Sequence, residues 1–155
     1  MDRRSSGFTL VEALVALAVM GVLAGIGAVV ARPSPEVHAA RALRALLLQA
    51  RAEAIWSGTP VAVVEDQGGF TARRQGEGAP ACEGPQLAAV RLRDFHGVVV
   101  SQGLWSGGLL WLPSGSGRAC SGGGVISGTV ELRGPFGRCS VVVSSLGRVR
   151  VEVVR

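Results

Sequence analysis

A single apolar stretch near the N-terminus constrains this chain more than any other feature. Phe8–Ala31 spans twenty-four residues and contains one charged residue, Glu12. As a helix it is about 36 Å long at ~1.5 Å per residue, enough to cross a hydrocarbon core of ~30 Å. The leader Met1–Gly7 carries Arg3 and Arg4, so the positive-inside rule keeps the N-terminus in the cytoplasm. The pattern predicts a single-pass membrane anchor.

The carboxylate of Glu12 needs a partner or a function, because a charge within an apolar span costs roughly 3 kcal/mol. It ends the run Gly7-Phe8-Thr9-Leu10-Val11-Glu12. This run resembles the prepilin leader of type IV pilins and type II secretion pseudopilins. The resemblance implies that prepilin peptidase cuts after Gly7 and methylates Phe8, and that Glu12 is the assembly carboxylate. The alternative is a plain membrane anchor in which Glu12 has no such role.

Composition limits the part of the chain beyond the anchor to one domain. The chain has 155 residues, of which 48% are hydrophobic and 17% charged, so it is not a disordered tail. Its 23 glycines follow no regular period, which favours a turn-rich β domain over collagen or a helical bundle. All 16 basic residues are arginine, and the formal charge of +5 suggests an anionic partner such as nucleic acid or lipid head groups.

Residues 32–58 are expected to form an amphipathic helix of the globular domain. Ser34 suits the N-cap and Pro35 the first turn, while Gly58 and Pro60 end the helix. Apolar residues recur at steps of three and four: Ala39, Ala40, Leu43, Leu46, Leu47, Ala50, Ala54 and Ile55. The remaining surface is expected to carry Arg41, Arg44, Arg51 and Glu53.

Residues 59–155 are expected to form a β-sheet domain, because short β-branched runs alternate there with glycine-rich turns. The expected strands are Val61–Glu65, Phe70–Arg73, Leu87–Arg93, Val98–Ser101, Leu109–Leu112, Val125–Arg133, Ser140–Ser144 and Arg148–Val154. Hairpin turns are expected at 66–69 and 134–137, and loops at 75–85 and 114–124. One helix followed by antiparallel strands is an α+β arrangement.

Three sequence blocks resemble one pilin subgroup, the GspH/FimT-type minor pseudopilins. They are Ala50–Ile55 (ARAEAI), Leu110–Gly115 (LWLPSG) and Val142–Arg150 (VVSSLGRVR). The resemblance implies a long N-terminal helix, part membrane anchor and part amphipathic, packed on two antiparallel β-sheets. It implies a bacterial inner-membrane protein with a periplasmic β domain and with other pilins or pseudopilins as partners. After extraction the subunit would enter a pilus or pseudopilus, including its tip.

The last expected strand brings two arginines to one face. Side chains alternate along a strand, so Arg148 and Arg150 point to one side, and Val149, Val151 and Val153 point to the other. The valines suit a core, and the arginines then project together outward. Two guanidinium groups on a rigid strand can contact successive phosphates.

Gly-Arg-x-Arg at this place resembles the DNA-binding motif of FimT-type minor pilins, which capture extracellular double-stranded DNA for uptake. Gly147 would supply the turn, with Arg138 and Arg155 as additional contacts. Two functions therefore compete: a minor pilin that binds DNA for natural transformation, and a GspH-type minor pseudopilin with a structural or initiating role in type II protein secretion. A solvated strand end or a contact to another pilin would explain the arginines without DNA.

Three cysteines, Cys82, Cys120 and Cys139, follow the membrane segment and are expected in an oxidising compartment. One disulfide and one leftover thiol are expected. If 125–133 is a straight strand, Cys120 and Cys139 lie about 26 Å apart at ~3.3 Å per residue, whereas a disulfide needs Cα atoms within ~7 Å. That disfavours this pair unless the glycine-rich loop folds back, and Cys82 can pair with either partner.

The sequence offers no active site. His38 and His96 have no cysteine or carboxylate constellation around them and are expected at the surface or in turns. No metal-ligand spacing, nucleophile elbow or phosphate-binding loop is present, so neither an enzyme nor a cofactor is expected. Trp56, Trp105 and Trp111 are expected in the core rather than as platforms for stacked bases.

Overall fold

The computed structural model divides the chain into two compact units, Met1–Pro33 and Ser34–Arg155. The structure describes residues 9–30, 34–66, 68–76, 78, 82–103, 107–122 and 127–154. Side chains are described throughout these ranges except at 25–30 and 154.

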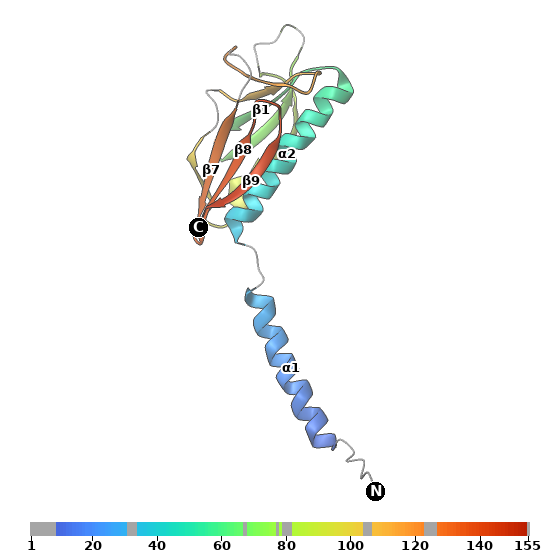
Figure 1. Ribbon diagram of the computed structural model, residues 1–155. Helices are drawn as coiled ribbons and strands as arrows, with labels where there is room; N and C mark the ends of the chain where they lie inside the picture. The colour runs from blue at the N-terminus through green and yellow to red at the C-terminus, as the bar shows by residue number, and fades with distance from the viewer. Residues whose placement is uncertain are drawn as a thin grey trace. The chain divides into compact units, whose positions relative to one another are not determined.

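The first unit contains one helix, α1 (Leu10–Val30, Figure 1), with Glu12 in its first turn. Its large apolar side chains are exposed rather than packed within the chain: Leu10, Val11, Leu14, Val15, Leu17, Val19, Met20, Val22 and Leu23. The expected membrane span begins at Phe8 and ends at Ala31, which both lie outside the described residues. Among the helices that the structure describes, none is both long and apolar enough to cross a membrane.

The second unit begins with the helix α2 (Pro35–Ser57), and local chemistry fixes both of its ends. Ser34 is extended, and its backbone carbonyl accepts hydrogen bonds from the N–H groups of Val37 and His38. The Ser34 hydroxyl makes no capping hydrogen bond, so this N-terminus is closed by backbone alone. Gly58 ends the helix with a φ of 66°, a left-handed conformation that glycine adopts without strain.

In the described ranges, nine strands build two antiparallel sheets against α2. One sheet has the order β3-β2-β1-β5-β6 and the other β4-β7-β8-β9. The strands are β1 (Val61–Asp66), β2 (Gly69–Arg74), β3 (Gln86–Arg91), β4 (Val99–Gln102), β5 (Leu109–Trp111), β6 (Gly117–Ala119), β7 (Gly128–Gly134), β8 (Gly137–Val143) and β9 (Val149–Val154). A 3₁₀ turn (Leu92–Asp94) follows β3. Figure 1 shows α2 running alongside β9 and β8.

The core lies where α2 meets the two sheets. Its largest fully buried side chains are Trp111, Phe70, Leu43, Leu47, Leu109 and Leu132. Each contributes about 1.5–3 kcal/mol of hydrophobic burial. The α+β class, with a helix on two antiparallel sheets, is confirmed.

The structure contains one strand that the sequence prediction lacks. The segment 114–124 was expected to be a loop, but it contains β6, which pairs with β5. Gly117 in this strand packs so closely that a Cβ atom there would lie 2.9 Å from Leu109 Cδ1. A glycine strand carries no β-branched signal, which explains why the sequence pattern did not show it.

The predicted burial was wrong at the end of α2 and of β9. Trp56 is 88% exposed, and Ile55 and Val153 are also exposed. Ala54 is the last buried residue of α2, so the final turn extends beyond the surface that the sheets cover. Trp111 is buried as expected, and Trp105 lies outside the described residues.

The cysteines divide into one disulfide and one buried thiol. Cys82 is joined to Cys120 with a Cα–Cα distance of 5.6 Å, which ties the segment before β3 to the end of β6. Cys139 is a free thiol within β8. Burial raises the pKa of Cys139, the charge of Glu36 raises it further, and Arg41 acts in the opposite direction.

Candidate functional site: the arginine-lined edge of the β domain

Of the residues predicted for processing and assembly, Gly7 and Phe8 lie outside the described residues, and Glu12 is described. Glu12 Oε2 accepts hydrogen bonds from the Thr9 N–H at 3.3 Å and from Thr9 Oγ1 at 3.2 Å. The Glu12 N–H in turn donates to Thr9 Oγ1 at 3.3 Å. This reciprocal arrangement is a capping box, so the carboxylate also stabilises the start of α1.

A tight turn presents the two arginines of the Gly-Arg-x-Arg motif. The Gly147 N–H donates to the Ser144 carbonyl at 2.8 Å, and the Ser144 N–H donates to the Arg148 carbonyl at 2.9 Å. The Arg148 N–H donates to Ser144 Oγ at 3.1 Å. Gly147 has a φ of +76°, and a Cβ atom there would lie 3.1 Å from Trp111 Cζ3. Both the conformation and the close approach require glycine at this position.

Arg51 supports this turn from α2. Its Nε donates to the Gly115 carbonyl at 3.0 Å, and its Nη1 donates to the Gly147 carbonyl at 3.1 Å. Its guanidinium carbon lies 5.7 Å from the ring centroid of Trp111. One arginine therefore joins the three sequence blocks that resemble GspH/FimT proteins. The apolar spacing placed Arg51 on the remaining, polar surface of the helix. It did not predict the contacts with Gly115 and Gly147, because these residues lie far from Arg51 in the sequence.

Arg148 and Arg150 are exposed, whereas Val149 between them is buried. Arg44 of α2 donates from Nε to the Val149 carbonyl at 3.4 Å and so lies beside them. Within the part of the chain that the structure describes, neither Arg148 nor Arg150 forms an ion pair. Arg44 is a member of this site that sequence reasoning did not identify.

The structure does not bring the other two predicted arginines to this turn. Arg138 pairs with Glu131 at 3.5 Å. It lies opposite Val154, at the far end of β9 from Arg148. Arg155 lies outside the described residues. The candidate site therefore consists of the start of β9 and the facing side of α2.

Two adjoining hollows form one groove along this edge, here called the α2–β9 groove. The first has a volume of about 650 Å³ and the second about 630 Å³. They share Arg44, Val149 and Arg150. The first is also lined by Leu48, Arg51, Ser144, Leu146, Gly147 and Arg148. The second is also lined by Val37, Arg41, Val151, Glu152 and Val153.

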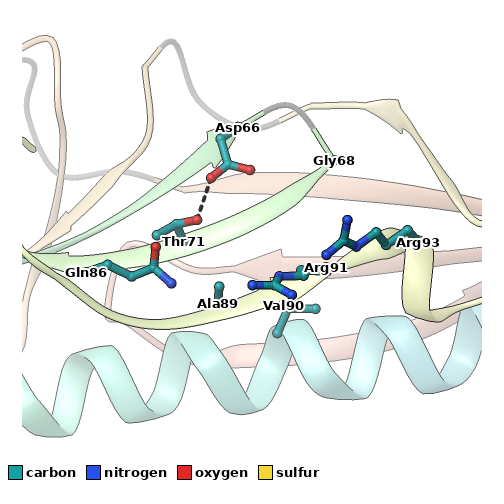
Figure 2. Close-up of a pocket in the computed structure, with 8 residues that line it drawn as sticks. All are labelled: Asp66, Gly68, Thr71, Gln86, Ala89, Val90, Arg91 and Arg93. Carbon is teal, nitrogen blue, oxygen red and sulfur yellow. Dashed lines mark hydrogen bonds between the residues drawn. The ribbon is translucent and has the colours of Figure 1, made fainter.

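A smaller hollow of about 240 Å³ lies on the other sheet, beside β2 and β3 (Figure 2). Asp66 accepts a 2.5 Å hydrogen bond from the Thr71 hydroxyl, and Arg91 and Arg93 line the opposite side. Its lining contains neither histidine nor cysteine. Among the described residues no group of three or more His, Cys, Asp or Glu could hold a metal ion.

Comparison with known families decides the affiliation. Residues 2–28 match the prokaryotic N-terminal methylation motif. Residues 39–147, most of the chain, match the family described as type II transport protein GspH. The chain belongs to the GspH family. Its members are structural pseudopilins, so the expectation that the chain is not an enzyme is confirmed.

The fold agrees with this affiliation. The structure is similar to that of the minor pseudopilin EpsH from the type 2 secretion system of Vibrio cholerae, with a TM-score of 0.57 and 18% identity. The similarity covers 77% of this chain and 98% of the EpsH chain, and it confirms the pilin-like fold. No curated protein is significantly similar in sequence.

These matches confirm the resemblance to prepilins and to GspH-type subunits. They favour the type II secretion alternative over DNA uptake as the main function. The methylation motif implies processing by prepilin peptidase, anchoring in the inner membrane through the N-terminal segment, and assembly with other pseudopilins. The GspH match ends at Gly147, so it does not extend to Arg148 and Arg150.

Proposed function

We propose that this protein is a structural minor pseudopilin that assembles into the pseudopilus of a type II secretion system. The observation that carries the proposal is the GspH match, which runs from Ala39 in α2 to the turn before β9. The methylation motif covers α1 as well, so both parts of a pseudopilin are present in the expected order.

Assembly is proposed to depend on α1. Its exposed leucines and valines would pack against the equivalent helices of neighbouring subunits. Cleavage after Gly7 would free the amine of Phe8, which would pair with Glu12 of a neighbour. In an apolar filament core such a pair is favourable only when both charges are matched and hydrogen-bonded.

The test compares two substitutions that each remove one of the two side chains of the capping box. Glu12→Ala removes both the cap and the assembly carboxylate, whereas Thr9→Val removes the cap alone. We expect both variants to be processed by the peptidase. Only Glu12→Ala should disappear from sheared pseudopili, as measured by quantitative immunoblotting. Wild-type incorporation of Glu12→Ala would overturn the proposed assembly role.

A second candidate function is contact with double-stranded DNA through Arg148 and Arg150. Its support is that both side chains are exposed at the start of β9, follow a hydrogen-bonded turn, and have no ion pair among the described residues. Arg138 does not belong to this contact, because it is paired with Glu131 at the other end of the strand. Arg155 remains a predicted addition.

This candidate is tested with the full-length protein in nonionic detergent and a fluorescent DNA duplex over a salt series. If Arg148 and Arg150 contact two phosphates, the logarithm of affinity should fall with the logarithm of salt with a slope of about −2. Arg148→Ala with Arg150→Ala should abolish binding. Arg91→Ala with Arg93→Ala removes the same charge from the other sheet and serves as the matched control. Absence of binding at low salt would exclude the DNA function.

A further inference from the structure

The α2–β9 groove has a chemistry that assembly through α1 does not use. We propose that it binds an acidic, extended segment of a neighbouring pseudopilin subunit, which adds as a strand to the outer edge of β9. This inference rests on the proposed structural function and names the chemistry of the partner.

The first support is charge. The lining contains five arginines against one carboxylate: Arg41, Arg44, Arg51, Arg148 and Arg150 against Glu152. None of the five forms an ion pair within the part of the chain that the structure describes. Arg44 uses Nε to hold the Val149 carbonyl, which leaves both terminal nitrogens for a carboxylate. An occupant with several carboxylates matches this excess.

The second support is the backbone of β9. Within the described sheets β9 pairs only with β8, so its other side is an open edge. The Ser144 N–H donates to the Arg148 carbonyl, and every second residue from Arg148 onward therefore directs its backbone toward β8. Val149, Val151 and Val153 direct theirs to the outer edge, where Arg44 already occupies the Val149 carbonyl, so Val151 and Val153 supply the carbonyls for a new strand. An extended polypeptide can add main-chain hydrogen bonds there, with affinity from the backbone and specificity from side-chain sites.

The third support is apolar surface at one end of the groove. Leu146 is 86% exposed at the tip of the turn, and Leu48 of α2 is exposed in the same lining. Two leucines beside arginines suit an apolar side chain flanked by acidic ones. A DNA backbone would use neither the leucines nor the strand edge, so the combination favours a polypeptide.

The fourth support is rigidity. The turn before β9 is held by its own hydrogen bonds and by Arg51, which reaches the carbonyls of Gly115 and Gly147. A binding surface that is ordered before its partner arrives loses less conformational entropy on association. These hydrogen bonds therefore order the turn at one end of the groove before a partner binds.

The experiment uses the full-length protein in nonionic detergent and a short fluorescein-labelled peptide of alternating Glu and Val that ends in Leu. Binding is followed by fluorescence anisotropy. We expect Arg44→Ala with Arg150→Ala to weaken binding about tenfold or more, since charge-assisted contacts are lost. Arg150→Glu, at an exposed position, should weaken it similarly without disturbing the fold. Arg91→Ala with Arg93→Ala should leave the affinity unchanged.

Two control peptides separate charge from strand addition. The same peptide with Gln in place of Glu should bind at least about tenfold more weakly, because the carboxylates are absent. A peptide N-methylated at every residue keeps the charge but cannot donate backbone hydrogen bonds, and it should also bind more weakly. Equal binding of the Gln peptide, or of the groove variants, would overturn the inference.

Three further outcomes distinguish the alternatives. If a DNA duplex binds in an Arg44- and Arg150-dependent manner while the acidic peptide does not, the groove is a nucleic-acid site and the inference is wrong. If the peptide does not bind but the wild-type chain still enters pseudopili, the inference fails while the proposed function stands. If the chain is absent from pseudopili altogether, the proposed function fails whatever the peptide does.

Discussion

The two helices of this protein are similar in length but use their apolar side chains in opposite ways. α1 leaves leucines and valines exposed, whereas α2 buries Leu43, Leu46 and Leu47 against its own sheets. α2 is thus stabilised by packing within the chain, whereas the large apolar side chains of α1 are exposed. Helices in proteins derive most of their stability from such packing. Under the proposed function, α1 would gain it from neighbouring subunits.

The largest expected effect on stability comes from replacing a leucine by alanine in α2, and the same replacement in α1 is the comparison. Leu47 is 0% exposed, and Leu47→Ala should lower the free energy of unfolding of the β domain by about 2–5 kcal/mol. Leu14 is 58% exposed, and Leu14→Ala should leave that free energy unchanged while reducing incorporation into pseudopili. Chemical denaturation followed by tryptophan fluorescence measures the first quantity. A destabilising effect of Leu14→Ala on the β domain would contradict the division between the helices.

The next prediction concerns the Cys82–Cys120 disulfide, which lies within the β domain. Cys82 and Cys120 are separated by 38 residues. Cys82→Ser with Cys120→Ser removes the cross-link that closes this loop, and this should lower the free energy of unfolding by roughly 4 kcal/mol. Reducing agent should produce the same shift in the wild type and none in the double variant. At temperatures where the double variant is partly folded, the amount incorporated into pseudopili should be proportional to its folded fraction.

A smaller effect is expected at the turn before β9. Gly147→Ala must adopt a φ of +76° and place its Cβ 3.1 Å from the Gly115 carbonyl oxygen, so it should cost about 2 kcal/mol. Gly58→Ala shares the positive φ but meets nothing within 4 Å, so it should cost about 1 kcal/mol. Equal thermal shifts for the two variants would show that close packing at the turn contributes nothing.

The smallest effect concerns pH. The pKa of Cys139 is raised by burial first and by Glu36 second, above an ordinary value of 9.0. The folded state therefore holds the proton more tightly than the unfolded state, and the stability it contributes is present below pH 9.0 and is lost as pH rises beyond it. Cys139→Ala should remove this decline from the pH profile of the unfolding free energy. An unchanged profile would contradict the assignment to Cys139.

The sequence predicted the elements that have a clear local period. The helix Pro35–Ser57 follows from apolar spacing and end signals, and most strands follow from β-branched runs. The strand around Gly117 was missed because glycine shows no strand preference, and it is held by pairing with β5. Local pattern therefore predicts an element only where the side chains themselves favour it.

The sequence predicted fewer of the residues that form the candidate site. Alternation along the last strand correctly placed Arg148 and Arg150 at the surface. It could not show that Arg51 and Arg44 approach them from α2, since those contacts join residues about a hundred positions apart. Spacing along the chain also left the partner of Cys82 open. Long-range neighbours of this kind depend on how the sheets are arranged, which no local pattern specifies.

The capping box at Thr9 and Glu12 has a consequence for the energetics of filament growth. The Glu12 carboxylate accepts both capping bonds through Oε2. Under the proposed assembly role, Oε1 would take the amine of a neighbouring subunit while the capping box stays in place. Apolar contact between helices would then supply most of the free energy of growth, and the ion pair would fix the axial stagger between successive subunits. The start of the helix would be capped in the same way before and after a subunit joins the filament.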